Sequence, residues 1–153
     1  MNPLDPRPPR RLWHASRANI DRPTIAGRTE GENHANSGLG IYCATEPASY
    51  IASFGAFIHE LTLHPEARVM RMTISELSAM GWARGEPRER DWFEQEGRRL
   101  GQSFELIELI EISGRADQAI VLNDSAIVAC SVQSAAEFLA SLPPEPPRSG
   151  PRF

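Results

Sequence analysis

The stretches that decide the fold are LWHASR at residues 12–17 and GLGIYCA at residues 38–44. Each is a short apolar run typical of a strand, and each carries one chemically capable side chain, His14 in the first and Tyr42 in the second. Neither run is informative alone. Their order, together with the segments that follow, indicates one site that is built from two adjoining strands.

The composition is that of an ordinary globular domain, with 153 residues, 41% hydrophobic and 24% charged. This length allows one domain with a real core. No apolar run approaches the ~20 residues that cross a bilayer, so no membrane association is expected. The net charge of −4 argues against a basic nucleic-acid-binding surface. We expect a folded domain over 11–142, between a disordered Pro/Arg-rich lead-in (1–10) and a disordered Pro-rich tail (143–153).

Cysteine and lysine usage bears on the compartment. Cys43 and Cys130 lie in apolar strand-like runs, which favours buried thiols over a disulfide and fits a reducing compartment. The chain contains no lysine. A GC-rich genome explains this, and so does selection for escape from ubiquitin in a protein delivered into a target cell. We therefore expect a cytoplasmic protein or a delivered one.

Strands alternate irregularly with helices along the chain, which predicts the α+β class. Strands are expected at 11–16, 39–44, 57–63, 68–72, 106–112, 118–122 and 127–132. Helices are expected after a Thr45 cap, from the Thr73–Glu76 capping box, over 89–100, and from the Ser134–Glu137 capping box. Residues 82–88 are expected to form a loop, and the strands at 57–63 and 68–72 to join across residues 64–66.

This order of segments resembles the ADP-ribosyltransferase superfamily, in the branch of the poly(ADP-ribose) polymerases and diphtheria toxin. That branch carries a His, a Tyr and a Glu on three separate strands. Residues 12–17 are similar to its His-Gly-Ser/Thr motif, and residues 38–44 to its Gly-x-Gly-Ile/Phe-Tyr motif. Its third motif corresponds to residues 117–123, where Gln118 stands in the place of Glu. The resemblance covers roughly residues 12–132. It implies split antiparallel β-sheets flanked by short helices.

The resemblance implies that NAD is the substrate and assigns roles in the first motif. His14 would hydrogen-bond the 2′-hydroxyl of the adenine ribose and orient the dinucleotide. The backbone of Ala15, where the family has Gly, would meet the nicotinamide carboxamide. Ser16 and Arg17 would touch ribose or diphosphate.

The second motif would hold the nicotinamide ring. Tyr42, approached through Gly40, would lie against one face of the ring. A second aromatic side chain from the following helix would cover the other face. Tyr50 is the first choice for this second aromatic and Phe54 the alternative.

The third position departs from the family pattern. Loss of nicotinamide creates an oxocarbenium-like sugar, which a nearby negative charge stabilises. Gln118 can hydrogen-bond a ribose hydroxyl but carries no charge, and losing such a partner costs roughly 100- to 1,000-fold in rate. Either Gln118 suffices, or Asp117, Glu108 or Glu111 supplies the carboxylate, or the chain binds NAD without turning it over.

The function expected from the resemblance is NAD-dependent ADP-ribosyl transfer to an unknown macromolecular acceptor, by a toxin or effector of bacterial or phage origin. An antitoxin or immunity protein would be its partner. The alternatives are an NAD glycohydrolase and a catalytically silent module that binds NAD or ADP-ribose. No metal site is expected, since His59, Glu60 and His64 lack the spacing of a helix-borne zinc pair and are interpreted as surface residues.

Overall fold

The computed structural model describes residues 10–17, 19, 22–24, 39–81, 90–110 and 116–143. Nearly all of the expected lead-in and tail, and the loop at 82–88, lie outside these residues. The elements are β1 (Arg10–Ser16), β2 (Ile41–Ala44), the 3-10 helix η2 (Ser49–Ser53), β3 (Phe57–Leu63), β4 (Val69–Thr73), α1 (Ile74–Gly81), α2 (Arg90–Gly101), β5 (Leu106–Ile110), β6 (Ala116–Val121), the 3-10 helix η4 (Asp124–Ala126), β7 (Ile127–Ser134) and α3 (Ala135–Ser141).

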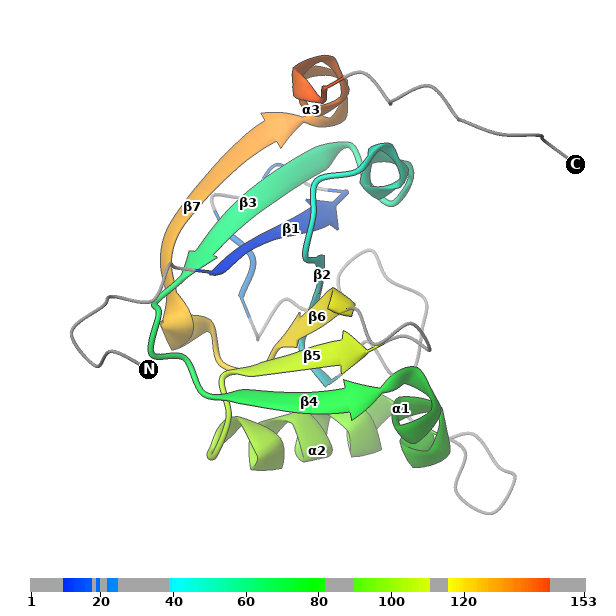
Figure 1. The fold of residues 1–153 in the computed structure, drawn as a ribbon, viewed down its shortest axis with the longest axis vertical. Coiled ribbons are helices and arrows are strands. Elements are labelled where there is room, and N and C mark those ends of the chain that lie inside the picture. Colours follow the sequence, from blue (N-terminus) through cyan, green and yellow to red (C-terminus); the bar gives the residue numbers. More distant parts are fainter. Residues whose placement is uncertain are drawn as a thin grey trace, which may run out of the picture.

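The strands form one seven-stranded mixed sheet in the order β4-β5-β6-β2-β1-β3-β7. In Figure 1 they fall into two groups, β7-β3-β1 above and β6-β5-β4 below, and β2 runs between them. The fold is α+β, as expected. The expectation of purely antiparallel pairing is wrong for β4 and β5, which are parallel. The segment that carries α1 and α2 connects them, and parallel neighbours require such a crossover.

The two groups of strands enclose the central core, and each group has a further core on its other face. Together these three cores make a layered molecule in which α2 covers β4, β5 and β6, and α3 with η2 covers β1 and β3 (Figure 1). The central core contains Leu12, Ile41, Cys43, Leu61, Leu63, Ala67, Leu106, Ala119, Val121, Ala126 and Ile127. The α2 core is centred on Phe93, and the α3 core on Trp13 and Phe138.

Both capping boxes are confirmed. The amide of Glu76 donates to Thr73 Oγ1 at 3.0 Å, and the amide of Glu137 donates to Ser134 Oγ at 3.1 Å. The helix expected to begin at Thr45 is wrong in type and in start. It is the short 3-10 helix η2, and its N-cap is Ala48, without a side-chain hydrogen bond.

Two further boundaries differ from expectation. Arg10 belongs to β1 and pairs with Leu63, so the first strand begins one residue before the expected domain start. The strands β3 and β4 do not pair with each other, although a short turn joins them, because they belong to different groups of the sheet.

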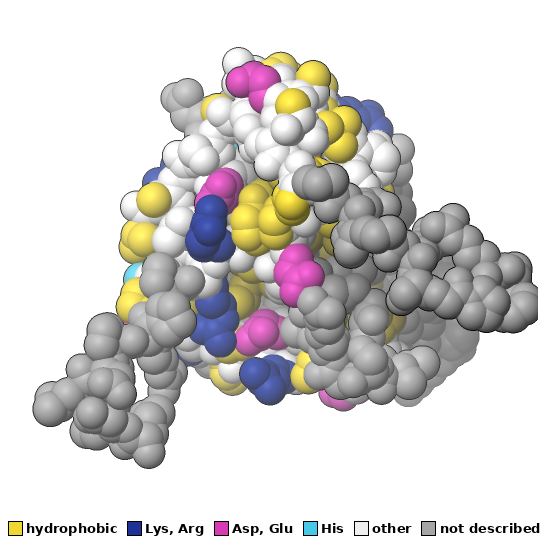
Figure 2. Space-filling view, turned by 45° about the horizontal axis from the view of Figure 1, so that its top comes forward, with side chains coloured by type: hydrophobic (Ala, Val, Ile, Leu, Met, Phe, Trp, Pro, Cys, Tyr) yellow, Lys and Arg dark blue, Asp and Glu magenta, His cyan; other side chains and the backbone are white. Residues whose placement is uncertain are grey.

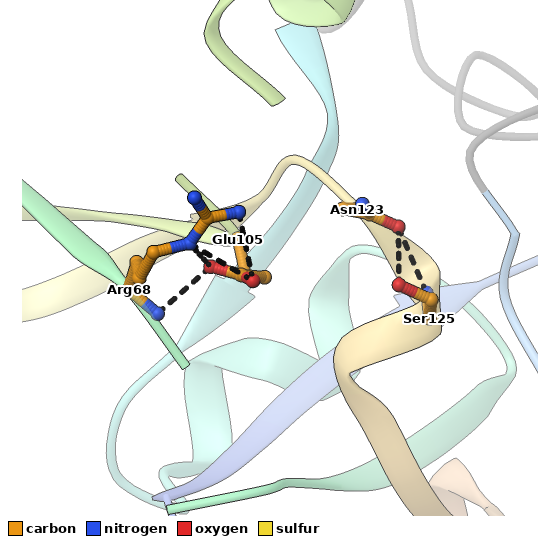
Figure 3. A network of polar contacts seen from close by, with 4 residues as sticks. All are labelled: Arg68, Glu105, Asn123 and Ser125. Atoms are coloured by element: carbon orange, nitrogen blue, oxygen red, sulfur yellow. Dashed lines mark hydrogen bonds and ion pairs between the residues drawn. The ribbon is translucent and has the colours of Figure 1, made fainter. Parts of the chain in front are cut away.

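Polar contacts secure the chain at the end of β6 remote from Gln118 (Figure 3). The amide of Arg68 donates to Glu105 Oε2 at 2.8 Å, and its Nε donates to the same oxygen at 3.1 Å. The Asn123 side chain caps η4 by accepting from the Ser125 amide at 3.1 Å. These contacts fix the starts of β4, β5 and η4. No helix in the described ranges is long and apolar enough to span a membrane.

Candidate functional site

The strands that carry the three predicted motif residues are neighbours in the sheet. Trp13 of β1 pairs with Ala44 of β2, and Ala44 pairs in turn with Gln118 of β6. His14, Tyr42 and Gln118 therefore lie around one junction, although they are far apart in the sequence. This junction is also where the two groups of strands meet (Figure 1).

The register shows which side chains share a face at this junction. Register partners share a face of a sheet, and successive residues of a strand point to opposite faces. Tyr42 therefore shares a face with Ala44 and Gln118, and Tyr42 and Gln118 are diagonal neighbours about 7–8 Å apart. His14 follows Trp13, the register partner of Ala44, so its side chain leaves β1 on the opposite face of the sheet. Its ring hydrogen-bonds to the main-chain oxygen of Tyr42.

His14 is buried and held in one orientation. Its exposed fraction is 8%, and its Nδ1 lies 2.6 Å from the main-chain oxygen of Tyr42. Because a carbonyl only accepts, Nδ1 carries the hydrogen and Nε2 of the neutral ring is the acceptor. Burial lowers the pKa of His14, and the hydrogen bond to Tyr42 opposes this in part. The ring is therefore neutral near pH 7, with Nε2 able to accept a hydrogen bond.

Tyr42 is half-buried and packs against the α2 core, so the core supports part of its ring. Gln118 is exposed. The glycine that precedes β2 has a packing role. A Cβ on Gly40 would lie 2.2 Å from the carbonyl oxygen of Val121, so only glycine fits there. The structure thus explains this glycine by the close approach of β2 and β6.

The two candidate aromatic partners lie together on η2. Tyr50 and Phe54 are 49% and 64% exposed, and their rings meet edge to face with centroids 6.3 Å apart. The chain then passes Gly55, whose Cβ, if present, would lie 2.3 Å from the main-chain oxygen of Ser16. This contact ties η2 to the end of β1. The short helix that carries both rings therefore lies against the end of β1, and the structure does not favour one ring over the other.

The rest of the first motif lies at the end of β1. Ala15 is half-buried and packs against the α3 core. The Ser16 Oγ lies 2.9 Å from Nε2 of His59. Arg17 follows the strand and is exposed.

Acidic, basic and hydrophobic side chains are interspersed on the face in Figure 2, and the described part of that face carries no continuous basic patch.

Glu108 does not replace the missing acid. Its carboxylate accepts from Arg10 at 3.2 Å, and its register partner is Ala119, so it points to the face opposite Gln118. The side chain of Asp117 and the whole of Glu111 lie outside the described residues.

His59 is the buried histidine next to His14 whose position sequence reasoning missed. The expectation that it lies on the surface is wrong, because its exposed fraction is 0%. Its strand alternates so that His59, Leu61 and Leu63 share one face, and two of these three are core leucines. This alternation of apolar residues along β3 is the sequence signal that predicts burial of His59. No three His, Cys, Asp or Glu side chains in the described residues are placed to hold a metal ion.

The two thiols agree with the sequence expectation in one respect and differ in another. Neither cysteine forms a disulfide. Cys43 is buried in the central core, whereas Cys130 is only half-buried. Burial raises the pKa of the Cys130 thiol, and nearby Arg22 opposes this. The raised pKa keeps this thiol protonated and a weak nucleophile.

No protein-family model and no curated protein matches this sequence. Among solved structures, one described as "Crystal structure of an anti-CRISPR protein" is similar over 81% of this chain and 93% of that chain. Its sequence identity is 16% and its TM-score is 0.40. Similarity at this level supports no conclusion about fold family or function.

Proposed function

We propose that this protein is an NAD-dependent ADP-ribosyltransferase with an ADP-ribosyltransferase-like fold. It would cleave the nicotinamide glycosidic bond and transfer ADP-ribose to a macromolecular acceptor. The observation that carries the proposal is the adjacency of β1, β2 and β6, which makes the strands of His14, Tyr42 and Gln118 neighbours, with Tyr42 and Gln118 on one face of the sheet and His14 on the other, hydrogen-bonded to the Tyr42 main chain. The resemblance places these residues on three separate strands, and the adjacency of those strands supports the proposal.

The state of His14 suits recognition of a hydroxyl. Its Nδ1 is committed to the Tyr42 carbonyl, so the ring cannot rotate without losing a buried hydrogen bond. A ribose hydroxyl can then donate to Nε2. A charged imidazolium has no acceptor, so burial, which keeps His14 neutral, keeps it competent for this contact.

The aromatic side chains suit a planar cationic leaving group. The nicotinamide of NAD is a pyridinium, and aromatic faces attract cations electrostatically. Tyr42 offers a ring supported by the α2 core, and η2 offers Tyr50 and Phe54 on an exposed turn. A rigid ring on one side and exposed rings on a short helix together fit capture of the nicotinamide.

In this proposal, Gln118 determines how fast bound NAD loses nicotinamide. Its amide can hydrogen-bond a ribose hydroxyl but offers no charge to an oxocarbenium-like sugar. Of the three candidate carboxylates, Glu108 is engaged by Arg10 and points to the opposite face of the sheet, and Asp117 and Glu111 lie outside the described side chains. This observation favours a second candidate, a module that binds NAD or ADP-ribose without turnover. A third outcome, hydrolysis, differs only in that water is the acceptor.

Incubation with NAD labelled on adenine, combined with assay of released nicotinamide, tests the proposal. Label on a protein or nucleic acid supports transfer. Free ADP-ribose with nicotinamide indicates a glycohydrolase. Saturable NAD binding with no nicotinamide release indicates the silent module, and absence of both binding and release refutes the proposal.

Matched variants test the roles at the junction. His14→Asn keeps an amide that can donate to the Tyr42 carbonyl but removes the acceptor at the Nε2 position. We expect it to weaken NAD binding about tenfold. Gln118→Glu restores a charge at an exposed position, so nicotinamide release should rise by up to about 100-fold. His64→Gln changes an imidazole in the β3–β4 turn and serves as the control.

A further inference from the structure

Two imidazoles are buried in an otherwise apolar interior. Among the described residues, His14 and His59 are the buried polar side chains, at 8% and 0% exposed. They are register partners on β1 and β3, and their ring centroids are 6.1 Å apart. A buried polar group weakens a fold unless it is hydrogen-bonded. The contacts of His59 therefore indicate what it does.

Both nitrogens of His59 are near polar atoms from other strands. Its Nε2 lies 2.9 Å from Ser16 Oγ at the end of β1. Its Nδ1 lies 4.0 Å from Sγ of Cys130 on β7, a weak contact. The strong contact is thus the one to Ser16, the residue that follows the His14-Ala15 pair of the first motif.

Ser16 is fixed from two sides. Gly55 packs directly on its main chain, where an added Cβ would lie 2.3 Å from its oxygen and 3.0 Å from its nitrogen. His59 holds its hydroxyl from within the sheet. Main chain and side chain are therefore both restrained, and a restrained hydroxyl binds a ligand at a lower entropy cost than a mobile one.

A purely structural role explains His59 less well. The neighbours on its face of β3 are the core residues Leu61 and Leu63, and an aliphatic side chain would continue that face without desolvating an imidazole. Burial and, secondarily, the charge of nearby His14 lower the pKa of His59 to about 4, so it is neutral near pH 7. A neutral imidazole retains one donor and one acceptor, which is what a link to a hydroxyl needs.

We propose that His59 is a positioning residue of this site, which through its hydrogen bond to Ser16 fixes the hydroxyl that contacts the bound dinucleotide beside His14. This inference rests on the proposed function. His59 touches no ligand in this scheme. Its effect on binding therefore passes through Ser16 alone.

A double-mutant cycle with NAD as the probe tests this inference. His59→Asn places an amide near the Nδ1 position and loses the contact to Ser16, whereas His59→Gln can reach the Nε2 position. We expect His59→Asn and Ser16→Ala each to weaken NAD binding about three- to tenfold. The double variant should bind no more weakly than Ser16→Ala, and His59→Gln should restore binding to within about twofold of the parent.

The outcomes separate the two proposals. Parent protein that binds NAD, with additive effects of His59→Asn and Ser16→Ala, overturns the positioning role alone. The same holds if His59→Gln, folded by circular dichroism, binds as weakly as His59→Asn. Parent protein that shows no NAD binding overturns the proposed function and the ligand contact of Ser16 with it.

Discussion

Acidification should destabilise this protein through His59. The pKa of this imidazole is about 4 in the folded protein against 6.5 for an unperturbed histidine. Between these values the unfolded chain binds a proton that the folded chain excludes. The stability that His59 contributes is therefore complete above pH 6.5 and is lost as the pH falls toward 4.

The magnitude follows from that interval. Each pH unit within it changes the free energy of unfolding by about 1.4 kcal/mol for one group. The whole interval from 6.5 to about 4 then amounts to about 3 kcal/mol, of which about 2 kcal/mol is lost by pH 5. Since small domains are stable by only about 5–15 kcal/mol, this loss is easily measured.

The assay is urea unfolding between pH 7 and pH 4.5, followed by the fluorescence of buried Trp13. The parent is compared with His59→Gln, in which a neutral amide replaces the titrating ring. Carboxylates titrate in both proteins, as does His14 with its own lowered pKa, so the difference between the two profiles reports His59 together with its electrostatic interaction with His14. The difference should change by about 2 kcal/mol between pH 6.5 and pH 5.

A control keeps the titrating group and removes its partner. Ser16→Ala leaves His59 buried, and burial is the largest cause of its lowered pKa, so its profile should run parallel to that of the parent. If the profiles of His59→Gln and the parent are parallel from pH 7 to pH 4.5, the imidazole does not titrate as its burial requires and the reasoning is refuted.

Three substitutions test the packing that positions the site, each by urea unfolding at pH 7. Gly40→Ala should cost about 2–3 kcal/mol, because its Cβ would overlap the Val121 carbonyl oxygen; a cost below 0.5 kcal/mol would contradict this close approach. Phe93→Ala should cost about 3–5 kcal/mol, because Phe93 is only 1% exposed at the centre of the α2 core. Ser134→Ala should cost about 1 kcal/mol through loss of the hydrogen bond to the Glu137 amide, and substitution by glycine should cost only a few tenths.

Local patterns predicted the elements because their causes are local. Each capping box places a hydroxyl and a carboxylate within one helical turn, so Thr73 and Ser134 mark helix starts without any tertiary information. The strand expected at 106–112 is β5 over Leu106–Ile110, the part of that range that the structure describes. Its pairing with both β4 and β6 stabilises it as a strand, and its own residues do not specify those partners.

The order of strands could not be predicted in the same way. A short turn at 64–66 suggests that β3 and β4 lie close, yet they lie in opposite groups of the sheet. The helix after β2 is likewise determined by packing between residues far apart in the sequence. A good cap at Thr45 predicts an α-helix, but the chain has only a few residues before Gly55 must pack against Ser16. A single 3-10 turn fits that span.

His59 is the clearest case in which the sequence prediction misplaced a residue. The sequence offers two interpretations of a histidine in a strand, on the surface or inside, and the residues at i+2 and i+4 decide between them. Here these are leucines of the central core. The face of β3 that carries His59 is therefore buried, whereas its other face is buried at Ile58 under α3 and half-open at Glu60 and Thr62.

The variant Gln118→Glu should change the turnover of NAD without changing its binding, and the packing around residue 118 gives the reason. Its register partners are Ala44 on β2 and Leu109 on β5, and the residue after it, Ala119, points to the central core. The side chain is exposed, and a glutamate and a glutamine have nearly the same shape. Replacing one by the other therefore changes charge and leaves packing alone. Ligand affinity that depends on His14 and the aromatic rings should consequently be the same in the parent and in Gln118→Glu, while the rate of nicotinamide loss differs between them. A Gln118→Glu protein with altered NAD affinity and unaltered rate would mean that residue 118 contacts the dinucleotide away from the scissile bond.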